Sequence, residues 1–269
     1  MNKTSSRPAA ILRAILLPTL VAGALAAGLA TTATPSLAAS WSFGGERVEG
    51  NGSIKRQARQ ARQVAHFTGL ALEVPGKLEL RMGDSEGLTI ETDDNVLPLI
   101  ETVVENGTLK IRPAKRNLNL RTRNLKIVVN ARQIERLALG GSGSVDADLL
   151  RAPRLNIDLG GSGEINVRQL DSDSVSVTLG GSGDFKAGAG QARKLSVSIG
   201  GSGTVDMGRV QADNASISVA GSGEATVWAR HELSMTIAGS GDVNYYGDPR
   251  VSKSVVGSGD ARRIAAAPR

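Results

Sequence analysis

The sequence predicts an all-β protein folded as a parallel β-helix, and three observations lead to this fold class. Glycine is abundant, with 33 residues, whereas aromatic residues make up only 3% of the chain. The triplet GSG recurs along the second half of the chain at steps of 18 to 20 residues. In front of each triplet apolar and polar residues alternate strictly, as they do in a strand with one buried face.

The first 38 residues have the features of a secretory signal peptide. A basic start precedes a soft apolar run rich in Ala and Gly, and the small residues of "PSLAAS" suit signal peptidase. A membrane anchor helix is the weaker alternative, because Pro18 interrupts the run. We therefore expect the mature chain to begin at Ala39 or Ser40, without a membrane span. Its expected location is the periplasm, the outer surface or the medium.

Charge and cysteine content exclude several classes of protein. Cleavage leaves 29 basic and 26 acidic residues, so the mature chain is only weakly basic and nothing indicates nucleic-acid binding. Without cysteine the chain can form no disulfide, and its stability must come from packing.

Residues 39–63 form a polar, basic linker or edge. The run "KRQARQAR" from Lys55 to Arg62 is a solvated segment, or alternatively a contact for a polyanion or an outer surface.

Residues 64–130 are predicted to form the irregular first rungs of the β-helix. Alternating apolar residues occur at Leu78 and Leu80, and again at Leu109 and Ile111. Only "NVLPLIETVV" suggests a helical turn within this region. No domain boundary is visible after Val64, so residues 64–263 are expected to form one domain. Its regular repeats cover residues 131–263, and residues 264–269 form a C-terminal tail.

The regular repeats each consist of a strand, a glycine turn, a second strand and a polar turn. The triplets begin at Gly141, Gly161, Gly181, Gly201, Gly221, Gly239 and Gly257. A meander of hairpins and a coil of stacked rungs both fit this pattern. Equivalent positions hold equivalent residues, which favours a coil stacked in register at ~4.8 Å per rung. Gly161 and Gly163 are expected to need positive φ at a sharp corner, and Ser162 to bond locally to the backbone.

The stretch "FTGLALEV…LELRMGDSEGLTIETDDNVLPLIETVVENGTLKI", followed by "LALGGSGSVDA" and the later GSG copies, resembles the head GIN domain family of putative auto-transporter adhesins. The resemblance spans roughly Phe67 to Gly259. It implies a right-handed β-helix, similar in shape to pectin lyases, on exported bacterial proteins. It also implies an adhesion role and no established enzyme site, although fold similarity alone does not transfer function.

The residues offer no catalytic, cofactor-binding or metal-binding motif. The glycine turns lack the Lys-Ser/Thr of a phosphate loop, the third glycine of a dinucleotide site and the aspartate of a calcium-binding β-roll. His66 and His231 are far apart, and His231 is expected to be solvated. The residues after the triplets form an acidic column ending in Glu224, Asp242 and Asp260. Our main interpretation is that these acids lie at a solvated corner, where Arg262 and Arg263 are close enough to screen them. The alternative is that the stacked acids bind calcium weakly.

Small hydroxyl residues line the outward face of the strand before each turn, and we predict that this ladder is a binding face. Its members are Ser176, Thr178, Ser196, Ser198, Ser216, Ser218, Ser234, Thr236, Ser252 and Ser254. Long charged side chains are absent until Asp158 and Arg136. The alternative is that these residues have no binding role and only keep an exposed strand soluble.

The function predicted from the sequence is that of an exported, non-enzymatic interaction module. A cell-surface glycan, a protein or a second copy of the chain is the expected partner. One alternative is a carbohydrate-active enzyme of pectin-lyase-like shape, which a flank with convergent carboxylates and arginines would favour. The other alternative is a purely structural envelope protein.

Overall fold

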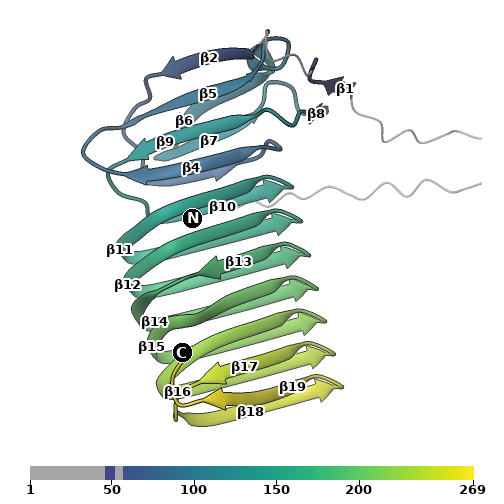
Figure 1. Cartoon of the computed structure of the whole chain (residues 1–269). Coiled ribbons are helices and arrows are strands. Elements are labelled where there is room, and N and C mark those ends of the chain that lie inside the picture. The colour runs from purple at the N-terminus through teal and green to yellow at the C-terminus, as the bar shows by residue number, and fades with distance from the viewer. Residues whose placement is uncertain (1–45, 52–56) are drawn as a thin grey trace, which may run out of the picture. The chain divides into compact units, whose positions relative to one another are not determined.

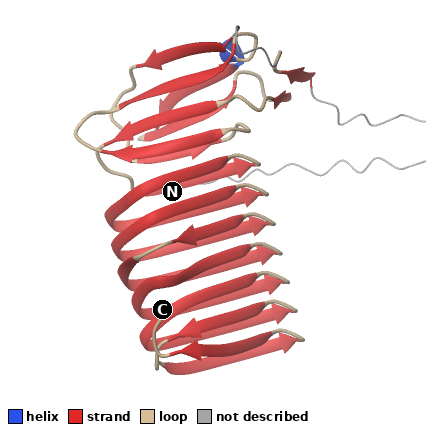
Figure 2. Cartoon of the chain, in the orientation of Figure 1, coloured by secondary structure: helices blue, strands red, loops and turns tan. Residues whose placement is uncertain are grey.

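The computed structural model describes residues 46–51 and 57–269, which form a parallel β-helix made almost entirely of strands (Figures 1 and 2). The predicted signal peptide, its cleavage site and the start of the basic run at Lys55 lie outside the described residues. No helix among the described residues is long and apolar enough to cross a membrane. The predicted all-β class and the stacked coil are confirmed, and the meander of hairpins is excluded.

The repeats form a stack of parallel rungs. Their strands are β10 (Arg136–Gly141), β11 (Ser144–Gly161), β12 (Glu164–Gly181), β13 (Asp184–Ala187), β14 (Gly190–Gly201), β15 (Thr204–Gly221), β16 (Glu224–Gly239), β17 (Asp242–Tyr246), β18 (Arg250–Gly257) and β19 (Asp260–Ala265). Long strands such as β12 bend midway and contribute to two sheets. The post-turn sheet contains segments that follow a glycine turn, such as residues 164–170. The pre-turn sheet contains segments that lead into the next turn, such as residues 175–181.

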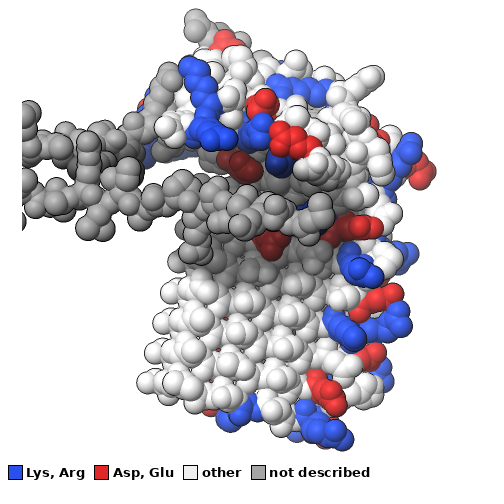
Figure 3. Space-filling model, turned by 180° about the vertical axis from the view of Figure 1, so that it is seen from behind, with Lys and Arg blue, Asp and Glu red and all other residues white. Residues whose placement is uncertain are grey.

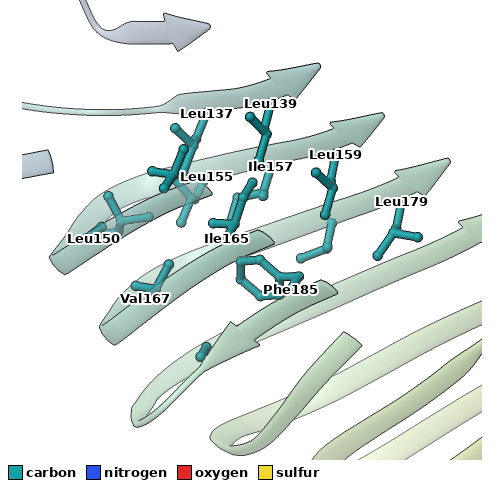
Figure 4. Close-up of a cluster of buried hydrophobic side chains, with 14 of the residues drawn as sticks. Leu137, Leu139, Leu150, Leu155, Ile157, Leu159, Ile165, Val167, Leu179 and Phe185 are labelled. Carbon is teal, nitrogen blue, oxygen red and sulfur yellow. The ribbon is translucent and has the colours of Figure 1, made fainter. Parts of the chain in front are cut away.

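The register of the stack matches equivalent positions of successive repeats. Val177 pairs with Ile157 on one side and Val197 on the other, always in parallel. Inward residues therefore form continuous apolar columns, and Figure 4 shows Leu155, Ile157 and Leu159 facing Ile165 across the interior. All four are buried. Each buried aliphatic side chain contributes about 1.5–3 kcal/mol, so a column of them can replace the missing disulfides.

The glycine corners are stacked as tightly as the strands. Gly161 has φ of 115°, a region that side chains with a Cβ rarely adopt. The backbone N–H of Ser162 donates to the Gly141 carbonyl of the preceding rung at 2.9 Å. A Cβ added to Gly161 would lie 2.5 Å from that same carbonyl oxygen. Both conformation and crowding therefore require glycine at this position.

Two details of the predicted corner are wrong. Gly163 does not adopt positive φ, and its requirement is purely steric, because a Cβ there would lie 2.6 Å from the Gly143 carbonyl oxygen. The hydroxyl of Ser162 makes no hydrogen bond to the described residues, and only its backbone N–H is engaged. Gly160, in contrast, has open space around its Cβ position, and Val256 occupies the same column in the last rung.

The N-terminal region covers one end of the repeats. Its elements are β1 (Glu46–Glu49), β2 (Gln57–Arg62), β3 (Gly69–Leu72), β4 (Lys77–Met82), β5 (Gly87–Asp93), the 3-10 helix η2 (Leu97–Leu99), β6 (Ile100–Glu105), β7 (Thr108–Pro113), β8 (Leu118–Arg121) and β9 (Lys126–Ala131). The helical turn suggested by the sequence is this short η2, and the residues after it form β6.

Only part of the N-terminal region continues the parallel stack. β3 pairs in parallel with β10 and β7, while β4 pairs in parallel with β11 and β9. Farther out, β6 runs antiparallel to β7, and β5 runs antiparallel to both β9 and β2. The expectation that this region simply adds longer rungs is therefore corrected. A hairpin at Asn106–Gly107, where both residues have positive φ, reverses the chain between β6 and β7.

Candidate interaction surface

The predicted hydroxyl residues lie together as two columns on the pre-turn sheet, a surface we call the hydroxyl face. Ser196 pairs with Ser176 and Ser216, and Ser198 pairs with Thr178 and Ser218. The columns continue through Ser234 and Thr236 to Ser252 and Ser254. All ten side chains point away from the core; Ser176 is half-buried and the other nine are exposed. Parallel pairing in register thus produces the regular array that the sequence predicts.

Toward the bend, the next outward column holds the charged residues Arg154, Lys194, Glu232 and Arg250. Toward the glycine corner, the surface beyond the two columns of the hydroxyl face is flat and uncharged. Next to them lies the column of Gly160, which holds Gly in most rungs and Ala220 and Ala238 in later ones. The exposed turn serines, such as Ser162, border it. Figure 3 shows this side of the repeats as an even white surface, with blue and red side chains confined to its edges. Asp158 and Arg136 end the uncharged columns, as the sequence indicates.

The outward face of the post-turn sheet has the opposite character. The Lys77 ammonium lies 2.7 Å from a carboxylate oxygen of Asp146, and Lys126 lies 2.9 Å from Glu79. The hydrogen bond from Lys77 holds the pKa of Asp146 below its usual value, and the hydrogen bond from Lys126 does the same for the pKa of Glu79. Short polar residues therefore line one face of the solenoid and paired charges the other.

The acidic column also lies on the post-turn sheet, in register as predicted. Glu224 pairs with Asp242, and Asp242 pairs with Asp260. The Asp242 carboxylate accepts the backbone N–H of Asp260 at 3.0 Å, and Glu224 accepts the Asn244 amide at 2.7 Å. Among the described residues no group of three or more acidic, His or Cys side chains could hold a metal ion.

The two arginines near this column do not pair with it. Arg262 reaches the side chain of Asn244, and the guanidinium of Arg263 donates to the Gly247 carbonyl. Neither arginine forms an ion pair with Glu224, Asp242 or Asp260, and their screening of the acids stays a prediction. The donors that contact the column are neutral, namely the Asn244 amide and backbone N–H groups.

A shallow groove of about 800 Å³ runs along the bend between the two sheets, and it was not among the features predicted from the sequence. Its residues come from matching positions of successive rungs, including Arg151–Pro153, Asp171–Asp173 and Gln191–Arg193. Because charged residues recur there at the repeat step, the spacing of Asp173, Arg193 and Asp213 could have revealed it. We call this feature the bend groove.

Each carboxylate of the bend groove lies beside a guanidinium group. Arg193 lies 2.6 Å from Asp173, Arg151 lies 3.2 Å from Asp171, and Arg230 lies 3.3 Å from Asp213. His231 is exposed near the end of the groove, 3.9 Å from Asp213, and His66 contacts Glu86 in the N-terminal region. The two histidines therefore belong to different places and form no common site.

This geometry defines the described part of the chain as a β-solenoid that presents extended, repetitive surfaces. The chain belongs to the family described as "putative auto-transporter adhesin, head GIN domain", whose model matches residues 66–249. The resemblance seen in the sequence is thereby confirmed. No curated protein matches the chain.

Solved structures of similar proteins share the fold. A putative adhesin from Bacteroides fragilis NCTC 9343 is 23% identical, with a TM-score of 0.74 over 81% of this chain and 100% of that one. A putative lipid binding protein from Parabacteroides distasonis ATCC 8503 is 26% identical, with a TM-score of 0.63 over 81% and 100% of the two chains. A putative adhesin from Parabacteroides merdae ATCC 43184 is 19% identical, with a TM-score of 0.63 over 81% and 99%.

Proposed function

We propose that the protein is an exported, non-enzymatic interaction module that contacts an extended cell-surface glycan or protein through its hydroxyl face. The observation that carries this proposal is the flat, uncharged array of short hydroxyl side chains, repeated in register over successive rungs. Short side chains cannot enclose a small ligand, so the partner must itself be extended. The adhesin names of the family and of two solved relatives support the same class of function.

The hydroxyl face is suited to contact because approaching it requires little desolvation of charge. Removing an ionised group from water costs far more than removing a hydroxyl that regains a hydrogen bond. The post-turn face, with its ion pairs at Asp146 and Glu79, would impose that larger cost. Each hydroxyl contact is weak, so many rungs must act together, and several copies on a cell would add avidity.

The enzymatic alternative has one observation in its favour, because the bend groove gathers carboxylates and arginines on one flank. Glycoside hydrolysis needs two carboxyl groups that face the scissile bond, one of them as a proton donor. In the groove Asp171, Asp173 and Asp213 are each engaged by an arginine. This arrangement favours binding over cleavage. Release of new reducing ends from a polysaccharide by the purified protein would overturn the non-enzymatic assignment.

The adhesion proposal is tested by placing arginine in the middle of the hydroxyl face. The double variant Ser196→Arg/Ser216→Arg should remain folded, because both side chains are exposed and no core residue changes. Its binding to whole cells and to immobilised cell-surface glycans should fall strongly. The matched control Thr204→Arg/Thr226→Arg adds the same charge on the post-turn sheet and should bind normally. Unchanged binding of the folded hydroxyl-face variant would exclude this face as the contact surface.

Export and a purely structural role are tested separately. N-terminal sequencing of the native protein should find Ala39 or Ser40 first, and an intact Met1 in a membrane fraction would contradict export. Fractionation of cells should then place the mature chain in the periplasm, on the outer surface or in the medium. A protein that is exported but binds neither cells nor glycans would be a structural component of the envelope.

A further inference from the structure

We infer that the bend groove is a second, independent binding site, and that its ligand is a linear anionic polysaccharide. Its floor consists of small side chains, Ala152, Ser172 and Ala192, of which the two alanines are each 5% exposed. Outward residues on either side of the floor form two rims. Because three successive rungs each contribute one floor residue and two rim residues, the groove extends along the solenoid axis and fits an extended polymer.

The rims have an excess of positive charge. A smaller hollow shares Pro153, Asp173 and Arg193 with the groove and adds Arg154 and Lys194. Together the two hollows are lined by six basic and three acidic side chains. Since the three acids are already matched by Arg151, Arg193 and Arg230, the surplus charge is available to a ligand. The mature chain as a whole is nearly balanced, so this local surplus is not a consequence of overall composition.

Two of the surplus cations are placed in a regular way. Arg154 and Lys194 lie in one column with Ser174 between them. Within the described part of the chain, neither makes a hydrogen bond or an ion pair with another residue. Two rungs separate them, which corresponds to roughly 9.6 Å between their backbones. A polymer with one acidic group per two sugar units could therefore place successive charges at both.

The paired residues of the groove supply the remaining recognition. The pairs Arg193–Asp173 and Arg151–Asp171 connect neighbouring rungs and hold planar donors and acceptors in place along the rims. Gln169 donates to the same Asp171 carboxylate at 2.8 Å, which restricts that side chain further. Preorganised groups of this kind lose little entropy on binding, and they match the hydroxyls of a sugar chain.

The direct test titrates the folded full-length mature protein with a hyaluronan octasaccharide, which has one carboxylate per disaccharide, by isothermal calorimetry. Binding should be measurable at low salt and should weaken as salt is added. The double variant Arg154→Gln/Lys194→Gln should weaken it about tenfold, because two exposed ion pairs are lost. The matched control Arg168→Gln/Lys186→Gln removes the same charge from the post-turn sheet, outside the lining of the bend groove, and should leave the affinity unchanged.

Further probes distinguish the ligand class and the site. A neutral chito-oligosaccharide of equal length should bind at least about tenfold more weakly. Equal binding of that neutral oligomer, or of single-stranded DNA with the same number of charges, would overturn the assignment to an anionic polysaccharide. Equal loss in the control variant, or no binding of the octasaccharide at all, would overturn the site. Ser196→Arg/Ser216→Arg should bind the octasaccharide at least as tightly as the native protein, because its added positive charges lie beside Lys194, so failure here and failure of the hydroxyl-face proposal are distinguishable.

Discussion

The N-terminal region and the repeats are stabilised by different means, although they share one apolar core. In the repeats the same backbone contacts recur at every rung, and they depend on glycine corners such as Gly161. In the N-terminal region individual side-chain contacts hold the strands, such as the buried Asp93 carboxylate and the charged cluster around Glu105. The repeats therefore contain many equivalent positions at which a substitution would destabilise the fold. The irregular N-terminal region contains only a few such positions, and each of them is different.

The largest expected effect comes from the corners of the repeats. The variant Gly161→Val/Gly163→Val should lower the free energy of unfolding by more than about 3 kcal/mol, because Val resists positive φ and its Cβ collides with the preceding rung. Urea denaturation followed by circular dichroism measures this loss. Gly160→Val/Gly180→Val is the matched control, since both positions are open, and should cost much less. Equal costs in the two variants would show that crowding at the corner is unimportant.

The N-terminal region should be most sensitive at Asp93. This carboxylate is fully buried and accepts hydrogen bonds from the Thr122 hydroxyl at 2.7 Å and the Asn124 amide at 3.2 Å. Asp93→Ala leaves both donors without their partner and should cost about 1–3 kcal/mol. Asp94→Ala, which removes a neighbouring exposed carboxylate, should change stability by less than about 0.5 kcal/mol. A chemical denaturation series on the two variants checks the difference, and similar values would contradict a special role for Asp93.

The sequence predicts the repeats well because every rung obeys the same local rule. Alternation places Val177 and Val197 in the core, and the fixed step brings Ser196 beside Ser216 without further information. The hydroxyl face could therefore be predicted residue by residue. The local rule does not specify how closely successive corners approach each other. The steric requirement for glycine at Gly163 was therefore not predicted.

The irregular region and the bend groove were harder to predict. Antiparallel pairing of β5 with β9 depends on contacts between distant segments, and alternation looks identical in parallel and antiparallel strands. The bend groove depends on where a strand changes direction, and residues 144–161 form one continuous strand with no glycine or gap at the bend. The available signals were the recurrence of charged residues at matching positions and Pro153 within this strand.

The two ends of the repeats also differ, because one is covered and the other is open. Strands of the N-terminal region cover one end, whereas β18 and β19 pair on one side only. In this last rung Lys253 lies in the column of buried Met235, and Arg263 lies in the column of Tyr245. The three exposed large aliphatic residues of the described chain, Val251, Val256 and Ile264, are also here. Inward charges are a known means of preventing a strand edge from pairing with another chain.

Replacing these charges should therefore promote self-association. Lys253→Met/Arg263→Val restores core-like residues at the open end, and a second copy can then pair with β18 and β19. Analytical ultracentrifugation should show oligomers that increase with protein concentration. Ser254→Val/Arg262→Val changes outward positions of the same strands and serves as the control. A monomeric double variant at all concentrations would show that the two charges do not guard this end.

The smallest expected effect concerns the ion pair that joins the two regions, between Lys77 of β4 and Asp146 of β11. The hydrogen bond and charge of Lys77 lower the pKa of Asp146 in the folded protein. A lowered folded pKa adds stability above the unfolded value of about 3.9, and this contribution disappears as the pH falls through the folded pKa. Both side chains are partly exposed, so solvent screening keeps the contribution small. Asp146→Asn should therefore be slightly less stable than the native chain at neutral pH, and denaturation curves should converge in strong acid. A difference that persists or grows there would mean that Asp146 acts through packing or hydrogen bonding at the junction rather than through its charge.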